Sequence, residues 1–477
     1  MKHSKFLHIS LLYEEDRQVE DRFKDLRRDL KRGNLLAQKR RKNRSKDASA
    51  MRLVSIERIL EGKHTEEKVA IRGWVYRKRI GKDVIFILLR DGTGVVQCTV
   101  RKDVQAWQQA EKVTIESSAI LSGKVKEDQR APGGYEISGE KFTIIGLAEN
   151  FPISKDKSED FLRDVRHLWL RSRRMNLIMR IRDETLRSIH ELFRRKDFIE
   201  VSPPMFITSA VEGGSTLFNL KYLDHDLYLT QSAQLYLEAL IYSLEKVYCI
   251  APSFRAEKSR TIRHLIEYWH VEPEQAFADV DDMMRLEEDL VSYACKNVAE
   301  KCKKELDELK INADELASVK PPFPRITYSD AVNRLNTKGF RLEWGQDFGF
   351  NEERTLAEDF SKPVFVYAYP KQIKAFYCKT YRDNPDLAMS ADLLVTGIGE
   401  ITTGGSRVDD KNELIERMRE FNLRPEDYEW YVDLRKYGTV PHAGFGLGVE
   451  RLLAWMLRLE NVMDAIPFPR TIRRFYP

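Results

Sequence analysis

Charged and aromatic residues gather between two apolar, β-prone runs near the middle of the chain. Arg255 and Glu257 lie two positions apart, so on an extended strand they face the same side, and Tyr268 on the returning run can reach that face. An arginine fork suits a phosphate or a carboxylate, and a flat ring suits stacking on a nucleobase. With Arg263 and His264 in the loop, this hairpin predicts a nucleotide cradle, although a solvated hairpin tip would carry similar residues.

Two further groups of residues could contribute to such a site. A glycine-rich turn at 444–448 precedes an amphipathic helix that carries Arg451. The turn alone resembles the start of a dinucleotide-binding fingerprint, but no strand–helix–strand unit with a ribose-binding acid follows it. Asp392 and Glu400 bracket another glycine-containing loop. Paired carboxylates near a triphosphate suit Mg²⁺, which takes one or two protein ligands and keeps several waters; two surface acids without a metal are the alternative.

Three segments, in this order, resemble the three signatures of the class II aminoacyl-tRNA synthetases. FIEVSPPM (198–205) is similar to the first, FRAE with RHLIEYWH (254–270) to the second, and GFGLGVERLLAW (444–455) to the third. The resemblance covers about residues 52–477. It implies a core of antiparallel sheet flanked by helices, activation of an amino acid by ATP as substrate, and Mg²⁺ as cofactor. It also implies a homodimer, because the first signature forms the subunit interface of this family.

By this resemblance Arg255 and Arg451 are the expected catalytic residues. Arg255 would bridge the amino-acid carboxylate and the α-phosphate, and Arg451 would hold the bent β- and γ-phosphates. Arg407 resembles the arginine that contacts the substrate side chain; relatives usually have one residue between the preceding serine and this arginine, whereas here it follows Ser406 directly. The residues implied for ATP are Arg255, Glu257, Arg263, His264, Tyr268, Glu400 and Arg451, and those implied for the metal are Asp392 and Glu400.

The resemblance also implies an amino-acid pocket. Glu212 would meet the substrate ammonium group, with Gln234 close to the same end. Aspartate-specific members usually have lysine and glutamine where this chain has Leu237 and Glu238. A carboxylate accepts hydrogen bonds from a carboxamide but repels a second carboxylate, by about 4 kcal/mol at ~4 Å and an effective dielectric near 20, so L-asparagine is favoured over aspartate. The residues implied for the amino acid are Glu212, Gln234, Glu238, Arg255 and Arg407.

Five short alternating runs between Val69 and Ile145, separated by turn signals, predict a small closed β-barrel of the OB type. Such barrels bind single-stranded nucleic acid, and in the synthetase subgroup for aspartate, asparagine and lysine an N-terminal barrel binds the tRNA anticodon. The resemblance implies that Phe86 stacks on an anticodon base, that Gln97 reads the central uridine, and that Glu136 is a third contact. Phe86 could instead be a ring of the barrel core, whereas Gln97 is hard to place in a core because a buried amide needs partners.

The predicted fold class is α+β, a five-stranded OB barrel followed by a class II catalytic core. In that core the spacing of apolar residues predicts a long helix over 167–196, and apolar runs predict strands at 363–370 and 374–377. The expected parts are a basic N-terminal extension (1–51), the anticodon-binding barrel domain (52–148), a polar hinge (149–166) and the catalytic domain (167–477) with a helical insertion at about 280–320.

The net charge of +5 belongs to the start of the chain: residues 1–50 hold 15 basic and 8 acidic side chains, and the remainder holds 65 and 67. This basic segment could add phosphate contacts, although a solvated tail is the favoured interpretation. No run of 18 apolar residues predicts a membrane span, and the apolar patch at 6–13 lacks a signal-peptide cleavage site. The five cysteines contain no CxxC pair, which argues against a disulfide framework and a zinc site. A cytoplasmic localisation without membrane association is expected.

Together these observations predict ATP-dependent ligation of L-asparagine to tRNA(Asn) through an aminoacyl-adenylate, with release of AMP and diphosphate. The expected partners are tRNA(Asn), ATP and L-asparagine, and the resemblance is to the archaeal and eukaryotic type of subgroup b. The alternatives are an aspartate-specific or non-discriminating relative, and a tRNA-independent asparagine synthetase on the same core. Phe86 and Gln97 argue against the second, because a small-molecule ligase does not need an anticodon reader.

Overall fold

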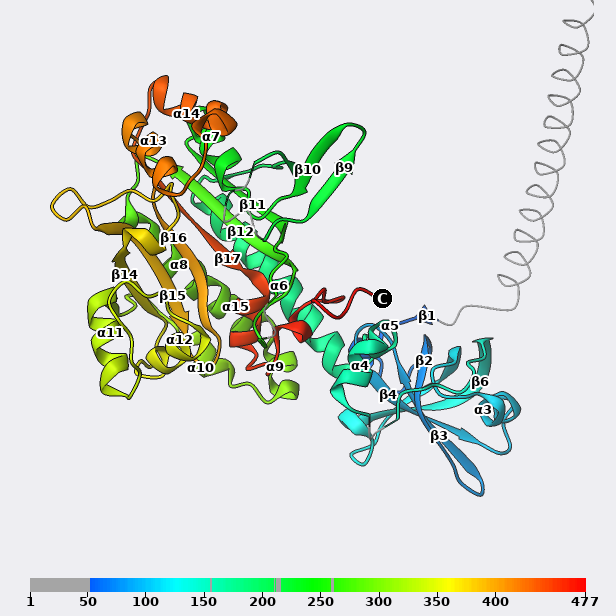
Figure 1. Ribbon diagram of the computed structural model, residues 1–477. Coiled ribbons are helices and arrows are strands. Elements are labelled where there is room, and N and C mark those ends of the chain that lie inside the picture. Colours follow the sequence, from blue (N-terminus) through cyan, green and yellow to red (C-terminus); the bar gives the residue numbers. More distant parts are fainter. Residues whose placement is uncertain (1–51, 155–156, 210, 212–215, 259–260) are drawn as a thin grey trace, which may run out of the picture. The chain divides into compact units, whose positions relative to one another are not determined.

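The structure is a computed structural model that describes residues 52–477, apart from 155–156, 210, 212–215 and 259–260 (Figure 1). The expected N-terminal extension and the expected substrate contact of Glu212 lie outside the described residues. The chain divides into two compact units after residue 154. Within the described residues no helix is long and apolar enough to cross a membrane.

The first unit is a closed barrel of five strands. The strands pair in the order β2-β3-β4-β6-β5, and β5 pairs back to β2, which confirms the predicted OB-type architecture. Along β3 every second side chain points inward, so that Ile85, Ile87 and Leu89 are buried and Phe86 points outward. The elements are β1 (Arg52–Leu53), α2 (Ile56–Leu60), β2 (Lys68–Ile80), β3 (Val84–Arg90), β4 (Val95–Arg101), α3 (Trp107–Lys112), β5 (Ser118–Glu127), η1 (Pro132–Gly134) and β6 (Tyr135–Gly146).

The second unit is built on an eight-stranded sheet in the order β13-β14-β15-β16-β17-β12-β11-β7. The six central strands are antiparallel, and the two edge strands, β13 and β7, pair in parallel with their neighbours. This arrangement confirms the predicted α+β core and the predicted hairpin, which is formed by β11 and β12. The strands are β7 (Ile199–Glu200), β11 (Lys246–Phe254), β12 (Glu267–Ala276), β13 (Arg325–Thr327), β14 (Val364–Pro370), β15 (Leu387–Val395), β16 (Gly399–Ser406) and β17 (His442–Gly448).

Helices pack against this sheet and bury its apolar side chains. Helix α8 (Val280–Lys301) packs against β15, β16, β17 and α6 (Arg173–Arg195), and its first turn is closed by a capping box between Asp279 and Asp282. The helix predicted over 167–196 is divided, because Ser172 is extended and caps α6 by accepting a hydrogen bond from the Met175 amide. The remaining helices are α4 (Glu159–Asp164), α5 (Arg166–Trp169), α7 (Gln234–Leu244), α9 (Lys303–Leu309), α10 (Ala313–Ala317), α11 (Tyr328–Thr337), α12 (Phe350–Ala357), α13 (Lys411–Glu420), α14 (Glu429–Lys436) and α15 (Val449–Met456).

One predicted strand of the core is wrong. The strand expected at 363–370 is present as β14, but 374–377 forms a loop that follows a 3-10 turn, η3 (Lys371–Ile373). Lys374 follows this turn in an extended conformation, and its Nζ donates to both carboxylate oxygens of Asp392, at 2.9 and 2.6 Å. A small separate sheet in the order β8-β10-β9 completes the unit, with β8 (Phe206–Ile207), β9 (Asn219–Tyr222) and β10 (His225–Leu229).

Candidate active site

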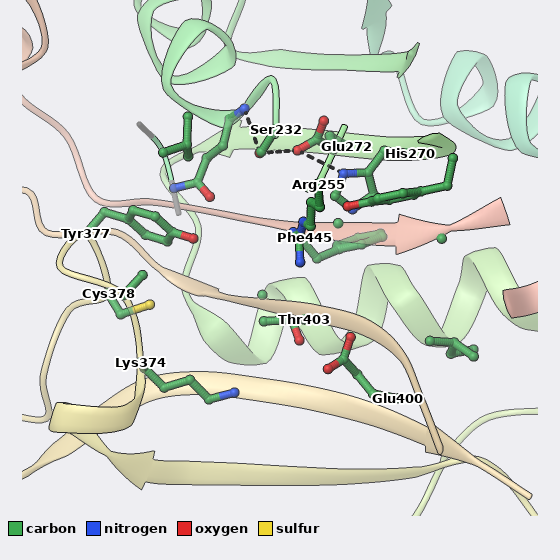
Figure 2. A pocket seen from close by; sticks show the side chains of 18 of the residues that line it. Ser232, Arg255, His270, Glu272, Lys374, Tyr377, Cys378, Glu400, Thr403 and Phe445 are labelled. Atoms are coloured by element: carbon green, nitrogen blue, oxygen red, sulfur yellow. Dashed lines mark hydrogen bonds and ion pairs between the residues drawn. The ribbon is translucent and has the colours of Figure 1, made fainter. Parts of the chain in front are cut away.

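A cavity of about 520 Å³ lies over strands β12, β16 and β17 (Figure 2). Every second residue of β12 from Tyr268 to Glu274 lines it, as the alternation of a strand requires. Glu238 and Asp392 do not belong to its lining. The predicted site residues that the structure brings together around this one cavity are Gln234, Arg255, Glu257, Arg263, His264, Tyr268, Glu400, Arg407 and Arg451.

The hairpin β11–β12 places the residues at one side of the cavity. Ser253 pairs with Tyr268 in the hairpin register, and Arg255 follows where the two strands separate. The guanidinium carbon of Arg255 lies 5.8 Å from the centre of the Tyr268 ring, and its Nη1 lies 4.0 Å from Oε1 of Glu257. A cation, an anion and an aromatic face are therefore adjacent at the cavity wall.

Arg451 reaches the same cavity from the first turn of α15. Its Nη1 donates to the backbone carbonyl of Glu400 at 3.0 Å and to the Glu400 carboxylate at 2.9 Å. Although burial acts to raise the pKa of Glu400, Arg451, Arg263 and Lys374 together hold that pKa below its usual range. Glu400 is therefore an ionised carboxylate in contact with a cation, and both groups face the cavity.

Arg263 forms a buried ion pair with a residue that the sequence did not single out. Both guanidinium ends donate to Glu353 of α12, one of them at 3.0 Å. Oε2 of Glu353, which accepts from Nη1 of Arg263, also accepts a hydrogen bond from the backbone N–H of Glu400 at 2.7 Å. The carboxylate of Glu353 thereby fixes the backbone of Glu400 at the cavity and holds Arg263 at its edge.

His264 is neutral at physiological pH. Burial lowers the pKa of its imidazole to about 4, and the nearby Arg451 and Arg263 contribute to this shift. One ring nitrogen, Nδ1, is hydrogen-bonded to the Thr261 hydroxyl. A neutral imidazole can still donate one N–H to a phosphate oxygen.

Only one of the two expected metal ligands faces the cavity. Glu400 lines it, and a carboxylate oxygen is the donor that Mg²⁺ prefers. The Asp392 carboxylate is instead bonded to the Lys374 ammonium and, at 2.9 Å, to the Thr403 hydroxyl. The donor set fits Mg²⁺ through Glu400, because this ion takes one or two carboxylates together with substrate phosphates and water; the contribution of Asp392 stays a prediction.

Arg407, at the end of β16, forms a buried, bidentate pair with Glu274. Its Nε and Nη2 donate to the two carboxylate oxygens of Glu274 at 3.1 and 3.0 Å, and its guanidinium carbon lies 5.4 Å from the Tyr377 ring centre. Burial acts to lower the pKa of Arg407, but Glu274, together with Glu238 and Tyr377, outweighs burial and raises that pKa, so the guanidinium stays charged. All three residues line the cavity, and they present a donor beside an acceptor.

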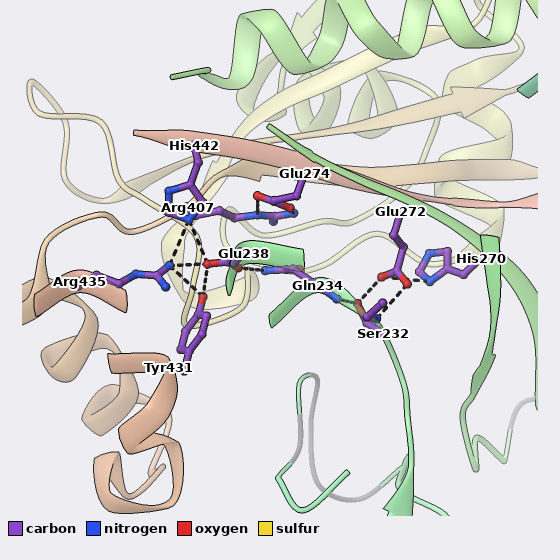
Figure 3. A network of polar contacts seen from close by, with 11 residues as sticks. Ser232, Gln234, Glu238, His270, Glu272, Glu274, Arg407, Tyr431, Arg435 and His442 are labelled. Atoms are coloured by element: carbon purple, nitrogen blue, oxygen red, sulfur yellow. Dashed lines mark hydrogen bonds and ion pairs between the residues drawn. The ribbon is translucent and has the colours of Figure 1, made fainter. Parts of the chain in front are cut away.

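Glu238 lies behind the cavity wall, in a network of polar contacts without access to solvent (Figure 3). Its Oε2 accepts hydrogen bonds from the Tyr431 hydroxyl at 2.7 Å, from His442 Nε2 at 3.0 Å and from Arg435. Its Oε1 accepts from Nε2 of Gln234 at 2.9 Å. In this structure Glu238 thus contacts Gln234, which lines the cavity, and a direct contact with substrate stays a prediction.

The same region holds a group of three potential metal ligands, Glu238, Glu274 and His442, whose donor atoms lie within 4.8 Å of one another. Arg435 and Arg407 already neutralise the two carboxylates. A divalent cation here would face two guanidinium groups at close range, which is electrostatically unfavourable. The group is therefore an ion-paired core.

On the barrel, the three residues predicted to read the anticodon share the outer face of adjacent strands. Gln97 and Glu136 are directly opposite each other in β4 and β6, and Gln97 Nε2 donates to Glu136 at 3.2 Å. Phe86 is half-buried on β3, and the Arg79 guanidinium carbon lies 5.3 Å from its ring centre. Phe86 is therefore not a core ring, and the face combines an amide, an aromatic ring and a cation.

Among the site residues without a role in the sequence analysis are Glu274, Glu353 and Lys374. Glu274 had a usable signal, because it lies two and four residues beyond Glu272 and His270 on the strand that follows the second signature. Glu353 and Lys374 lie in segments without a motif. Their partners, Arg263 and Asp392, are 90 and 18 positions away in the chain, and only the tertiary fold joins them.

Comparison with families of known proteins gives two matches. Residues 158–472 match the family described as tRNA synthetases class II (D, K and N), and residues 69–145 match the OB-fold nucleic acid binding domain. These two ranges contain the catalytic sheet with its cavity and the five-stranded barrel, respectively.

Individual relatives agree along nearly the whole chain. An asparagine–tRNA ligase from Thermococcus kodakarensis is 52% identical over 425 residues, which is 88% of this chain and 97% of the relative. The crystal structure of asparaginyl-tRNA synthetase from Pyrococcus horikoshii complexed with asparaginyl-adenylate has a TM-score of 0.85 at 47% identity, covering 87% of this chain and 97% of the other. Asparaginyl-tRNA synthetase from Entamoeba histolytica in complex with the same adenylate has a TM-score of 0.82 at 32% identity, covering 90% and 100%.

Proposed function

The chain belongs to the class II tRNA synthetases of the D, K and N group, and from this membership and the cavity we infer that it is an asparagine–tRNA ligase. It joins L-asparagine to ATP, giving asparaginyl-adenylate and diphosphate, and then transfers the asparaginyl group to tRNA(Asn) with release of AMP. The observation that carries this conclusion is the similarity, at 47% identity and a TM-score of 0.85, to a synthetase solved with asparaginyl-adenylate.

The first step needs positioning and charge neutralisation more than proton transfer. An α-carboxyl group with a pKa of about 3.5 is already ionised at neutral pH, so no general base is required to activate it. We propose that Arg255 binds this carboxylate and the α-phosphate together, because it stands at the cavity wall beside Tyr268. A guanidinium fork can hold both oxygens at once and stabilise the charge that develops between them.

The β- and γ-phosphates are assigned to Arg451, Arg263 and His264, which line the same cavity. Arg451 would exchange part of its contact with Glu400 for phosphate oxygens, and the neutral imidazole would add one N–H donor. Glu400 would hold a magnesium ion, which would further neutralise the phosphate charge when bound. Tyr268 offers its ring to the adenine, a stacking contact of about 1–3 kcal/mol.

The amino-acid side chain is assigned to the pair formed by Arg407 and Glu274. A carboxamide has a carbonyl oxygen that can accept from Arg407 and an NH2 group that can donate to Glu274, which retains acceptor capacity beside its two bonds to the arginine. An aspartate carboxylate offers no donor and would meet Glu274 with a like charge. The sequence placed this discrimination at Glu238; the geometry supports Glu274 as the acid that faces the substrate.

The barrel is proposed to hold the tRNA anticodon through Phe86, Gln97 and Glu136. The cation of Arg79 beside the Phe86 ring would add a phosphate or stacking contact, a combination that suits single-stranded nucleic acid. Gln97 keeps the carbonyl of its amide available, because its NH2 is engaged by Glu136. Phe86 would stack on one anticodon base while the Gln97 amide hydrogen-bonds to another, and both side chains must then lie on one outer face.

We propose that the protein is a cytoplasmic homodimer. The first signature exposes apolar side chains at Ile199, on the short edge strand β7, and at Met205, and the neighbouring Phe206 is exposed as well, as a subunit interface requires. The five cysteines are all free and buried, as in proteins of a reducing compartment.

The function is tested by ATP–diphosphate exchange with asparagine or aspartate as the only amino acid. The wild type is expected to exchange with asparagine and far less with aspartate. Arg255→Ala should lower the asparagine-dependent rate about a hundred- to a thousandfold, the effect of losing one preorganised charge donor. The matched control is Arg354→Ala, which removes an exposed arginine that forms an ion pair with Glu358 at the C-terminal end of α12, and should leave the rate unchanged. Exchange that does not depend on asparagine would refute the proposed function.

A further inference from the structure

The orientation of one amide at the cavity is set from behind. Gln234 is the first residue of α7 and lines the cavity, and its Nε2 donates to Oε1 of Glu238 at 2.9 Å (Figure 3). An ionised carboxylate only accepts hydrogen bonds, so the NH2 end of the amide must face Glu238. The carbonyl oxygen of Gln234 is consequently turned away from Glu238. A glutamine without such a partner could present either end, because the two ends have nearly the same shape.

Glu238 is suited to impose this orientation because it is ionised and held by hydrogen bonds on both carboxylate oxygens. Burial alone would raise the pKa of Glu238, but Arg435 and His442 outweigh burial and hold the pKa well below its usual range. Its Oε2 accepts from Arg435, His442 and Tyr431, and the side chains of the Glu238–Arg435–His442 group are fully buried. Because that oxygen is saturated with donors, only Oε1 is left for Gln234.

The partners assigned to the other groups of asparagine indicate which group the Gln234 carbonyl oxygen binds. The carboxylate of asparagine is assigned to Arg255 and its carboxamide to Arg407 with Glu274. The ammonium group carries three N–H donors, so it can bind Gln234 in addition to Glu212, to which the resemblance assigns it, and the carbonyl oxygen of a glutamine is a suitable acceptor.

We propose that Glu238 is a positioning residue for the ligase reaction, which fixes the Gln234 carboxamide with its carbonyl oxygen toward the ammonium group of asparagine. The inference rests on the proposed function and deepens it. It also assigns a role to α14, which lies outside the three signatures: Tyr431 and Arg435 of this helix hold Glu238, although they are 193 and 197 positions away from it. Neither residue lines the cavity.

The substitution Glu238→Gln tests this role because it should invert the amide at 234. The carbonyl of the new glutamine would take the place of Oε2 among Arg435, His442 and Tyr431, so its NH2 would face residue 234. Gln234 would then turn its own carbonyl toward position 238 and its NH2 toward the substrate ammonium group, where two donors meet. The KM for asparagine in ATP–diphosphate exchange should rise about ten- to a hundredfold, the effect of replacing one hydrogen bond by an unfavourable contact. The KM for ATP should change less than twofold.

A double-mutant cycle separates positioning from a general structural effect. In a Gln234→Leu background the amide is absent, so Glu238→Gln should change the KM for asparagine by less than twofold. The same ten- to hundredfold rise in both backgrounds would overturn the proposal. Glu287→Gln is the control for a buried glutamate, because Glu287 is bonded to Thr402 and does not line the cavity; it should not alter the KM for asparagine.

Two further measurements complete the test. Succinamate keeps the carboxamide and the carboxylate of asparagine but lacks the ammonium group, so its inhibition constant should be the same for wild type and Glu238→Gln; an equal loss for both ligands would contradict the assignment to the ammonium group. If Glu238→Gln does not fold, Tyr431→Phe can replace it, because it removes one of the three donors to Oε2. It should raise the KM for asparagine two- to fivefold when Gln234 is present, and not in the Gln234→Leu background. A wild type that shows no asparagine-dependent exchange would refute the function itself, whereas an additive cycle in an active enzyme would refute only this inference.

Discussion

The choice of asparagine over aspartate should reside in one carboxylate, that of Glu274. In the wild type this group is buried and bonded to Arg407 through both oxygens, at 3.1 and 3.0 Å. An aspartate side chain placed against the pair would bring a second carboxylate to within ~4 Å of Glu274. At an effective dielectric near 20 the repulsion is about 4 kcal/mol, or about a thousandfold in kcat/KM.

Glu274→Gln removes this repulsion while keeping the shape of the side chain. Asparagine loses the acceptor of its NH2 group, which should lower its kcat/KM about ten- to a hundredfold. Aspartate gains, because an uncompensated Arg407 now faces its carboxylate and the NH2 of the new glutamine can donate to it. The ratio of asparagine to aspartate kcat/KM should therefore fall by about four to five orders of magnitude.

The assay is ATP–diphosphate exchange with each amino acid over a range of concentrations, at saturating ATP. Glu287→Gln again serves as the matched control, and thermal unfolding shows whether each variant is folded. A Glu274→Gln enzyme that is folded and keeps the discrimination of the wild type would refute the reasoning, since the selecting charge would then lie elsewhere.

Three other predictions concern ATP, pH and tRNA. Arg451→Lys loses the planar fork and should lower kcat/KM for ATP in diphosphate exchange about ten- to a hundredfold without changing the KM for asparagine; an unchanged value would remove Arg451 from the phosphate site. His264 has a folded pKa of about 4, below the value of about 6.5 in an unfolded chain, so the unfolded state binds the extra proton and the native state loses stability as pH falls from 6.5 toward 4. The difference in melting temperature, His264→Gln minus wild type, should therefore be more positive at pH 5 than at pH 7.5. Equal differences at both pH values would contradict a neutral imidazole. Phe86→Ala and Gln97→Ala should raise the KM for tRNA and leave diphosphate exchange unchanged; Phe86→Ala does so because it removes one stacking contact with a base. A loss of exchange would mean that these substitutions act on the fold.

Local patterns were sufficient for the elements that carry the site. The alternation in β3 and β4 and the turns between them predicted the barrel, because side-chain periodicity and turn chemistry are local properties. The hairpin β11–β12 was also predicted, since its apolar runs flank a polar loop. The division of the long helix at Ser172 was missed, although a serine that precedes a helical run is a capping signal.

The placement of Glu238 shows where local reasoning ends. Gln234 and Glu238 are four positions apart on α7, so they lie on one face of this helix. Whether that face meets substrate or core depends on Arg435 and His442, which arrive from distant parts of the chain. A buried arginine from another helix joins Glu238 in an internal ion pair, and no local periodicity in the sequence indicates this partner.

The same limit applies to Asp392 and Lys374. A carboxylate at the expected spacing before Glu400 was interpreted as a metal ligand, and its engagement by the ammonium group of a lysine in a loop could not be foreseen. The loop itself was predicted as a strand because Phe376 and Tyr377 are apolar and β-prone. These side chains are buried against α13 and α14, so their hydrophobicity reflects burial without a strand.

The most direct test of the account is aminoacylation of transcripts with the anticodons GUU and GUC, each supplied with asparagine or aspartate. The arrangement of Arg407 with Glu274, together with the barrel face at Gln97, predicts rapid charging only for asparagine with the GUU transcript. Equal charging by aspartate, or charging that ignores the anticodon, would contradict it.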